Sequence, residues 1–161
     1  MNKLFRMDYE SPIGVIEIVS RADAVLSIMF VDRMSAVEHQ KEMPAVLHDC
    51  CTQLQEYFLG KRQTFTFAYE WEGTPFQQKV WDSLLQIPFA ATASYRDIAN
   101  MLQKEKAVRA VGNANGRNKL SIVIPCHRII GTSGKLTGYA GGLWRKEWLL
   151  NHEKKLKKVN F

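Results

Sequence analysis

Apolar and polar residues alternate in the first third of the chain, a pattern typical of short strands. Runs rich in Val, Ile and Phe predict three strands, over residues 4–9, 13–19 and 24–31. Ser11-Pro12 and the segment 21–23 supply the breaks between them.

From residue 46 to 58 the apolar positions recur every three or four residues, which predicts a helix with Gly60 as its C-cap. Cys50 and Cys51 lie on its apolar stripe and are interpreted as core thiols. Residues 65–69 alternate again and predict one more strand.

A domain boundary is expected near residues 70–73, giving an N-terminal α/β domain (1–72) and a C-terminal domain (73–161). Thr74, Pro75 and Gln77 then form a helix start, with Thr74 as N-cap and Gln77 completing a capping box. The predicted helix ends at Ile87-Pro88, and its expected buried face consists of Phe76, Val80, Trp81, Leu84 and Leu85.

Two short helices follow, one opened by Ser94 and running through Leu102, the other covering about 106–115. The tight turn between them favours a helix-turn-helix. A buried apolar run then leads to Pro125. A loop with five glycines (131–142) and a final helix (143–153) complete the chain, and this helix is expected to pack through Leu143, Trp144, Trp148 and Leu149.

Of the 161 residues, 46% are hydrophobic and 24% charged, as in a globular protein. No stretch approaches the roughly 18 apolar residues of a membrane span, and the N-terminus lacks the apolar core of a signal peptide. The cytoplasm is the expected location. Three cysteines without metal-type spacing predict neither a disulfide framework nor a metal site.

The net charge of +6 is divided unevenly. Residues 1–72 carry 7 Lys and Arg against 11 Asp and Glu, whereas residues 73–161 carry 15 against 5. The basic C-terminal half therefore suggests a polyanionic partner, although a solvated basic surface would give the same count.

Pro125-Cys126-His127-Arg128 places a thiol next to an imidazole and a guanidinium, at the end of the buried run. Such neighbours lower a thiol pKa and make it a nucleophile. A reactive thiol, a basic helix-turn-helix and a glycine-rich loop within ninety residues together indicate a thiol presented next to DNA.

Residues 73–153 closely resemble the O6-alkylguanine-DNA alkyltransferases, also called methylated-DNA–protein-cysteine methyltransferases. The resemblance is carried by the segments 75–81, 94–95, 109–112, 124–128, 138–142 and 146–150, together with Asn118 and Glu153. It implies a ribonuclease H-like roll followed by a mostly helical, winged-helix-like domain.

The resemblance implies that the alkyl group of O6-alkylguanine, and more weakly O4-alkylthymine, passes from duplex DNA to Cys126. The base is flipped out of the helix, the reaction occurs once per protein molecule, and no cofactor is needed. The expected partner is double-stranded DNA, bound in the minor groove with little sequence preference by a monomer.

Roles of single residues also follow from the resemblance. Cys126 is the nucleophile, His127 takes its proton through a water molecule, and Glu153 orients the imidazole. Tyr95 assists the departing guanine, and Arg109 enters the base stack. Asn118 braces the turn before the cysteine, and the base pocket is lined by Tyr139, Ala140 and the backbone of Ile129. Arg128 is expected to be structural.

Alanine occupies position 140 where some relatives have serine, which leaves open whether bulky adducts are accepted.

Two other functions remain as alternatives. A lesion sensor that binds alkylated DNA without transfer would typically lack the reactive cysteine. A cysteine hydrolase would leave the helix-turn-helix unexplained.

Overall fold

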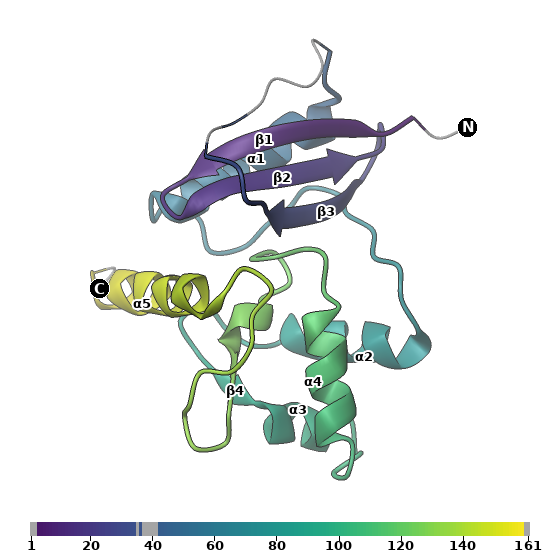
Figure 1. Cartoon of the computed structure of the whole chain (residues 1–161), viewed down its shortest axis with the longest axis vertical. Coiled ribbons are helices and arrows are strands. Elements are labelled where there is room, and N and C mark those ends of the chain that lie inside the picture. The colour runs from purple at the N-terminus through teal and green to yellow at the C-terminus, as the bar shows by residue number, and fades with distance from the viewer. Residues whose placement is uncertain (1–2, 35, 37–41, 160–161) are drawn as a thin grey trace. The chain divides into compact units, whose positions relative to one another are not determined.

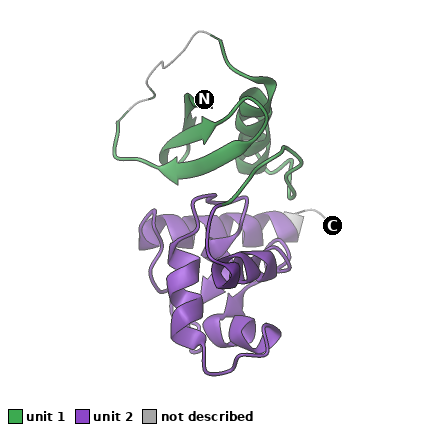
Figure 2. Cartoon of the chain, turned by 90° about the vertical axis from the view of Figure 1, so that its right-hand side faces the viewer, with its two compact units in different colours: residues 1–71 green, residues 72–161 purple. Residues whose placement is uncertain are grey.

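The chain forms two compact units, comprising residues 1–71 and 72–161 (Figure 2). The computed structural model describes residues 3–34, 36 and 42–159 (Figure 1). A strand-rich first unit and a mostly helical second unit confirm the predicted mixed α/β class.

Unit 1 is a three-stranded antiparallel sheet, in the order β1-β2-β3, with one helix packed on it. The elements are β1 (Phe5–Ser11), β2 (Gly14–Ser20), β3 (Val25–Phe30) and α1 (Ala45–Phe58). The β1–β2 turn is closed by Ser11, whose hydroxyl donates to Gly14 O at 2.7 Å. Sheet and helix share a buried core that includes Ile16, Ile18, Leu47 and Leu54.

The strand predicted over residues 65–69 does not form. Only Tyr69 makes a bridge, a parallel one with Val25 at the start of β3. The amide of Gln53 on α1 instead pairs with Thr66, accepting from its backbone N–H at 2.9 Å and donating to its hydroxyl at 2.8 Å. Gln53 thus satisfies the backbone N–H of Thr66, and among the described residues β3 pairs with the segment only around Tyr69, through Val25.

Unit 2 contains four helices, one 3₁₀ helix and a two-stranded parallel pair within the described residues. They are α2 (Pro75–Leu84), β4 (Ala93–Ser94), α3 (Tyr95–Met101), α4 (Val108–Gly116), η1 (Cys126–Arg128), β5 (Ile129–Ile130) and α5 (Leu143–Val159). The predicted capping box at Thr74 and Gln77 is confirmed. Trp81 ties α2 to α4 by donating from Nε1 to Ala114 O at 2.9 Å.

Helices α3 and α4 form the predicted helix-turn-helix. Ser94 and Asp97 make a capping box at the start of α3. The turn is closed by hydrogen bonds from Lys104 N to Ala99 O and from Ala107 N to Lys104 O. Gln103 takes a positive φ of 57° there, a conformation that a residue other than glycine adopts at some cost.

Two predicted buried faces are partly wrong. Leu85 on the α2 side is 38% exposed, and Leu143 and Trp144 at the start of α5 are 48% and 55% exposed. Helix α5 also continues past residue 153 to Val159. Its buried positions are Lys146, Leu149 and Glu153, which recur at helical spacing, so the inward face of this helix carries two charges.

Within the described part of the chain, no helix has the length and apolar character needed to cross a membrane.

Candidate functional site

Cys126 begins the 3₁₀ helix η1 and is 5% exposed. The apolar residues before it are buried, but they form turns rather than a regular element. Ile122 has a φ of 72°, an unusual conformation for a β-branched residue. The Cys126 N–H donates to Ile124 O at 2.7 Å, which closes the last of these turns.

Asn118 lies in the segment that links α4 to Cys126. Its amide donates to Ile124 O at 2.9 Å and to Leu120 O at 3.4 Å, and its Oδ1 accepts from Leu120 N at 2.9 Å. The side chain is buried, with 4% of the residue exposed. One amide therefore holds the turn that precedes the thiol from both of its ends.

His127 and Glu153 form a fully buried pair, with 2.7 Å between His127 Nε2 and Glu153 Oε2. Burial lowers the pKa of His127, and Glu153 only partly offsets this effect. A neutral imidazole that donates from Nε2 to the carboxylate leaves Nδ1 as its proton acceptor.

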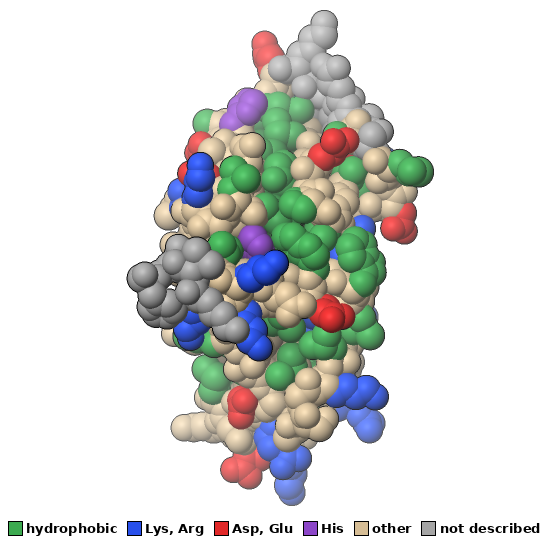
Figure 3. All heavy atoms as spheres, turned by 90° about the vertical axis from the view of Figure 1, so that its left-hand side faces the viewer, with side chains coloured by type: hydrophobic (Ala, Val, Ile, Leu, Met, Phe, Trp, Pro, Cys, Tyr) green, Lys and Arg blue, Asp and Glu red, His purple; other side chains and the backbone are tan. Residues whose placement is uncertain are grey.

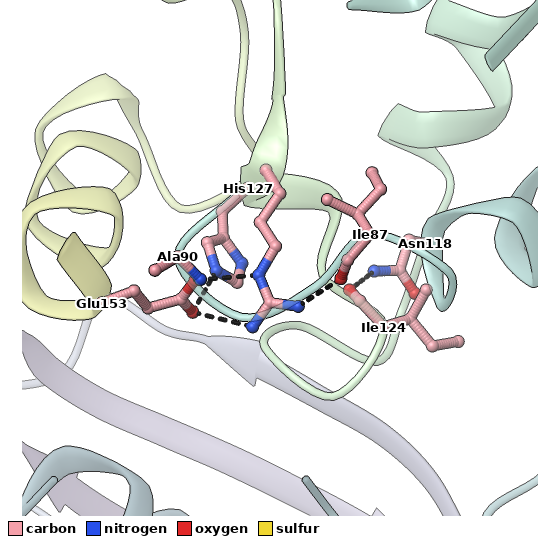
Figure 4. Close-up of polar contacts among 7 residues, drawn as sticks. Ile87, Ala90, Asn118, Ile124, His127 and Glu153 are labelled. Atoms are coloured by element: carbon pink, nitrogen blue, oxygen red, sulfur yellow. Dashed lines mark hydrogen bonds and ion pairs between the residues drawn. The ribbon is translucent and has the colours of Figure 1, made fainter. Parts of the chain in front are cut away.

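Glu153 is held ionised by its neighbours (Figure 4). Burial would raise the pKa of this carboxyl, but His127 and Arg128 outweigh it and hold the pKa well below the usual range. Arg128 donates to Oε1 at 2.8 Å and to Oε2 at 3.1 Å, and the Ala90 N–H donates to Oε1 at 3.2 Å. The site is therefore built around a buried carboxylate.

The Cys126 thiol is protonated at rest. Burial raises its pKa, while Asn118, Lys146 and the local backbone act in the opposite direction. A thiol in this setting needs a base to remove its proton and a cation to stabilise the thiolate.

Lys146 supplies that cation and is a residue whose role the sequence reasoning missed. It is fully buried on α5, and its Nζ donates to Thr137 O at 2.9 Å. Burial lowers its pKa to about 8, an effect that Cys126 partly opposes. The sequence held one signal for this residue. Lys146 lies one helical turn before Leu149 and two turns before Glu153, so it shares their face of the helix, and a buried lysine needs a partner.

Tyr95 reaches the site through Thr137. The Tyr95 hydroxyl lies 2.6 Å from Thr137 Oγ1, which joins the start of α3 to the glycine-rich loop. Ala93 and Ser94 pair in parallel with Ile129 and Ile130, so Tyr95 immediately follows a strand that lies beside the end of η1. Ile129 itself is fully buried, and its N–H donates to Cys126 O.

Tyr139 and Ala140 lie in the glycine-rich loop. The Tyr139 hydroxyl is buried. Its pKa lies well above the usual value, mainly because of this burial and to a lesser extent because Cys126 is near. Ala140 is exposed. The loop end is tied to α5 by Arg145, which donates to Gly141 O at 2.9 Å.

Arg109 stands on the first turn of α4 and is exposed. Within the part of the chain that the structure describes, its guanidinium has no hydrogen bond or ion pair, with Cys126 or with any other residue. Lys and Arg side chains project from unit 2 on the face shown in Figure 3.

The other cysteines lie in unit 1. Burial raises the pKa of Cys50 strongly and that of Cys51 to about 11, which leaves both unreactive near neutral pH. Among residues 3–34, 36 and 42–159, no three His, Cys, Asp or Glu side chains are placed to hold a metal ion.

Comparison with known proteins matches both units to one family. Residues 5–70 match the domain described as "6-O-methylguanine DNA methyltransferase, ribonuclease-like domain", and residues 75–155 match the DNA binding domain of the same enzyme. The first match agrees with the ribonuclease H-like roll expected for the N-terminal unit.

Curated relatives and solved structures agree. The chain is 45% identical to the constitutive methylated-DNA–protein-cysteine methyltransferase of Bacillus subtilis, over 90% of this chain and 92% of the relative. It is 42% identical to a Methanosarcina barkeri protein described by the same enzyme name, over 89% and 93%. The O6-methylguanine methyltransferase of Mycobacterium tuberculosis superposes with a TM-score of 0.84 at 38% identity, covering 95% of this chain and 94% of that one. A structure of that organism's OGT in complex with DNA gives 0.83 at 40%, covering 92% of each chain.

Proposed function

This chain belongs to the 6-O-methylguanine DNA methyltransferase family of DNA-repair alkyl-transfer enzymes, and we propose that Cys126 accepts the alkyl group of O6-alkylguanine in duplex DNA. The observation that carries the proposal is a buried thiol beside a His127–Glu153 pair and a buried lysine.

The first step makes the thiolate. The Cys126 proton passes by way of a water molecule to Nδ1 of His127, whose Nε2 stays bonded to Glu153. Glu153 stabilises the imidazolium that results, as the carboxylate of a catalytic triad does. Lys146 stabilises the new negative charge on sulfur.

The second step is an in-line displacement. The Cys126 sulfur forms a bond to the alkyl carbon, the bond from that carbon to O6 breaks, and the electron pair leaves with the guanine. A proton donated by Tyr95 to the leaving base neutralises its charge. The product on the protein is a stable thioether, so each molecule reacts once and no cofactor takes part.

DNA binding is assigned to the helix-turn-helix. Helix α4 enters the minor groove with little sequence preference, and the target base is flipped into a pocket lined by Tyr139, Ala140 and the Ile129 backbone. Arg109, exposed and without a partner in the described chain, fills the space left in the stack.

Three further points belong to the proposal. O4-alkylthymine is a weaker substrate, the protein acts as a monomer, and it works in the cytoplasm.

The test is a stoichiometric transfer assay on a duplex that contains one O6-methylguanine. One methyl group per protein molecule should appear on the peptide that contains Cys126, measured by intact-mass and peptide mass spectrometry. Cys126→Ser should take up none, whereas Cys51→Ser, which changes a thiol of unit 1, should react like the wild type. Full methylation of Cys126→Ser would refute the assignment.

A further inference from the structure

Four hydrogen bonds from Ala90, His127 and Arg128 reach the Glu153 carboxylate, two on each oxygen, and one of these four comes from His127 (Figure 4). Oε2 accepts from His127 at 2.7 Å and from Arg128 Nη2 at 3.1 Å. Oε1 accepts from Arg128 Nε at 2.8 Å and from Ala90 N at 3.2 Å. The reaction described above uses the His127 contact and leaves the other three without a role.

The Arg128 guanidinium is fixed from several directions. It forks onto Glu153, its Nη1 donates to Ile87 O at 2.9 Å, and its carbon lies 5.7 Å from the centre of the Phe89 ring. Only 7% of the residue is exposed. A forked Arg–carboxylate contact sets direction as well as charge, so Glu153 has little freedom to rotate.

Ala90 contributes through its backbone conformation. The Ala91 N–H donates to Pro88 O at 3.0 Å and closes a turn in which Ala90 is the third residue. Its φ is 67°, a value that favours glycine at this position. The turn holds an alanine in this unfavourable conformation, and in that conformation the N–H reaches Glu153.

We propose that Arg128 and the segment 87–91 are positioning elements for alkyl transfer, because they hold Glu153 ionised and oriented so that His127 rests as a neutral imidazole protonated on Nε2. The inference rests on the proposed function, since it concerns the groups behind the base that this function requires.

The charge balance of the buried site gives the physical reason. A lone buried carboxylate beside an imidazole favours the imidazolium, and an imidazolium cannot accept the Cys126 proton. Arg128 balances the charge of Glu153. The pKa of His127 is lowered first by burial and then by the positive charges of Arg128 and Lys146, whereas Glu153 raises it. Two further titratable groups of the site, Cys126 and Tyr139, have pKa values that burial raises, and both are uncharged near neutral pH.

The experiment measures the protonation of His127 directly. Nitrogen-15 NMR of the full-length protein without DNA reports the tautomer, and the rate of alkyl transfer from free O6-benzylguanine is followed against pH. In Arg128→Gln, the titration of His127 and the acid limb of the rate should both move up by about one pH unit. The rate should then fall about tenfold at the acid end and approach the wild-type rate at high pH.

Arg62→Gln is the matched control, because it removes an ion pair with Glu56 in unit 1 and should leave both measurements unchanged. Equal rate loss at every pH, with an unaltered His127 spectrum, would show that Arg128 only supports the fold. If Arg128→Gln does not fold, the wild-type spectrum decides: an imidazolium or an Nδ1–H tautomer at neutral pH overturns the proposal. A wild-type protein that transfers no alkyl group refutes the proposed function, yet the spectrum still tests this inference.

Discussion

Replacing Lys146 by Met should make the protein more stable and less active at neutral pH. Methionine has a similar length and no charge, so it can fill the same space on the inward face of α5. The lysine is fully buried, and within the described residues its Nζ donates one hydrogen bond, to Thr137 O.

The magnitude follows from the lysine's pKa. Burial lowers it from 10.5 to about 8, which costs the folded state about 3 kcal/mol at about 1.4 kcal/mol per pKa unit. Loss of the hydrogen bond to Thr137 O reduces the gain in the free energy of unfolding by about 1 kcal/mol. The net gain of about 2 kcal/mol should raise Tm by about 4–8 °C. Without the cation the pKa of Cys126 rises, and alkyl transfer should slow by about tenfold or more.

The gain should depend on pH in a defined direction. Between about pH 8 and 10.5 the unfolded chain holds a proton on Lys146 that the folded chain has lost, so wild-type stability rises relative to the variant. The advantage of Lys146→Met is therefore largest below pH 8 and shrinks as the pH approaches 10.5. Taking the difference between the two proteins cancels the titration of the groups that Lys146 does not influence, whereas Cys126 and His127 are coupled to Lys146 and do not cancel.

The assay combines urea unfolding from pH 6 to 10.5 with single-turnover methyl transfer. Lys79→Met, which changes an exposed lysine on α2, serves as control and should alter neither quantity in this way. A variant that is destabilised at pH 7, or whose stability difference does not change with pH, would refute the electrostatic reasoning. An unchanged transfer rate would show that Lys146 does not act on the thiol.

Four further outcomes are expected. Arg109→Ala should slow repair of duplex DNA more than reaction with free O6-benzylguanine, and equal losses in the two rate assays would contradict its role in the base stack. The logarithm of the binding constant for undamaged duplex should fall linearly with the logarithm of salt concentration, and binding should show little sequence preference. Titrations at several salt concentrations measure both. Asn118→Ala leaves buried partners at Leu120 and Ile124 unpaired, and it should destabilise unit 2 by about 3 kcal/mol in urea unfolding. Gln103→Gly relieves a positive φ in the helix-turn-helix and should raise Tm by up to about 4 °C in calorimetry.

Features that depend on neighbours in the chain were predictable. The capping boxes at Thr74 and Ser94 need only residues three positions apart, and the sequence contains both partners. The helix-turn-helix follows from helical periodicity and a short turn. The strand at 65–69 failed for the opposite reason, because its alternation is local but its partner, Gln53, lies on a helix.

The burial of charged side chains was not predicted from the sequence pattern. Lys146 and Glu153 both resemble surface residues of a basic helix, and Leu143 and Trp144 resemble its core. The structure reverses this pattern, with Lys146 and Glu153 fully buried and the two apolar residues about half exposed. A helical repeat gives the spacing of a buried face but does not identify which face meets the rest of the unit.

By itself the sequence determined the family and the helix-turn-helix, since each depends on short runs of residues, and it singled out Cys126 as the thiol proposed to react. Only the tertiary structure decided what surrounds that thiol. The Glu153 carboxylate accepts hydrogen bonds from residues 25, 26 and 63 positions away in the chain. Lys146 belongs to the same buried site. Buried charges are tolerated only when partners from separate elements converge on them, and that convergence is a property of packing rather than of any local pattern.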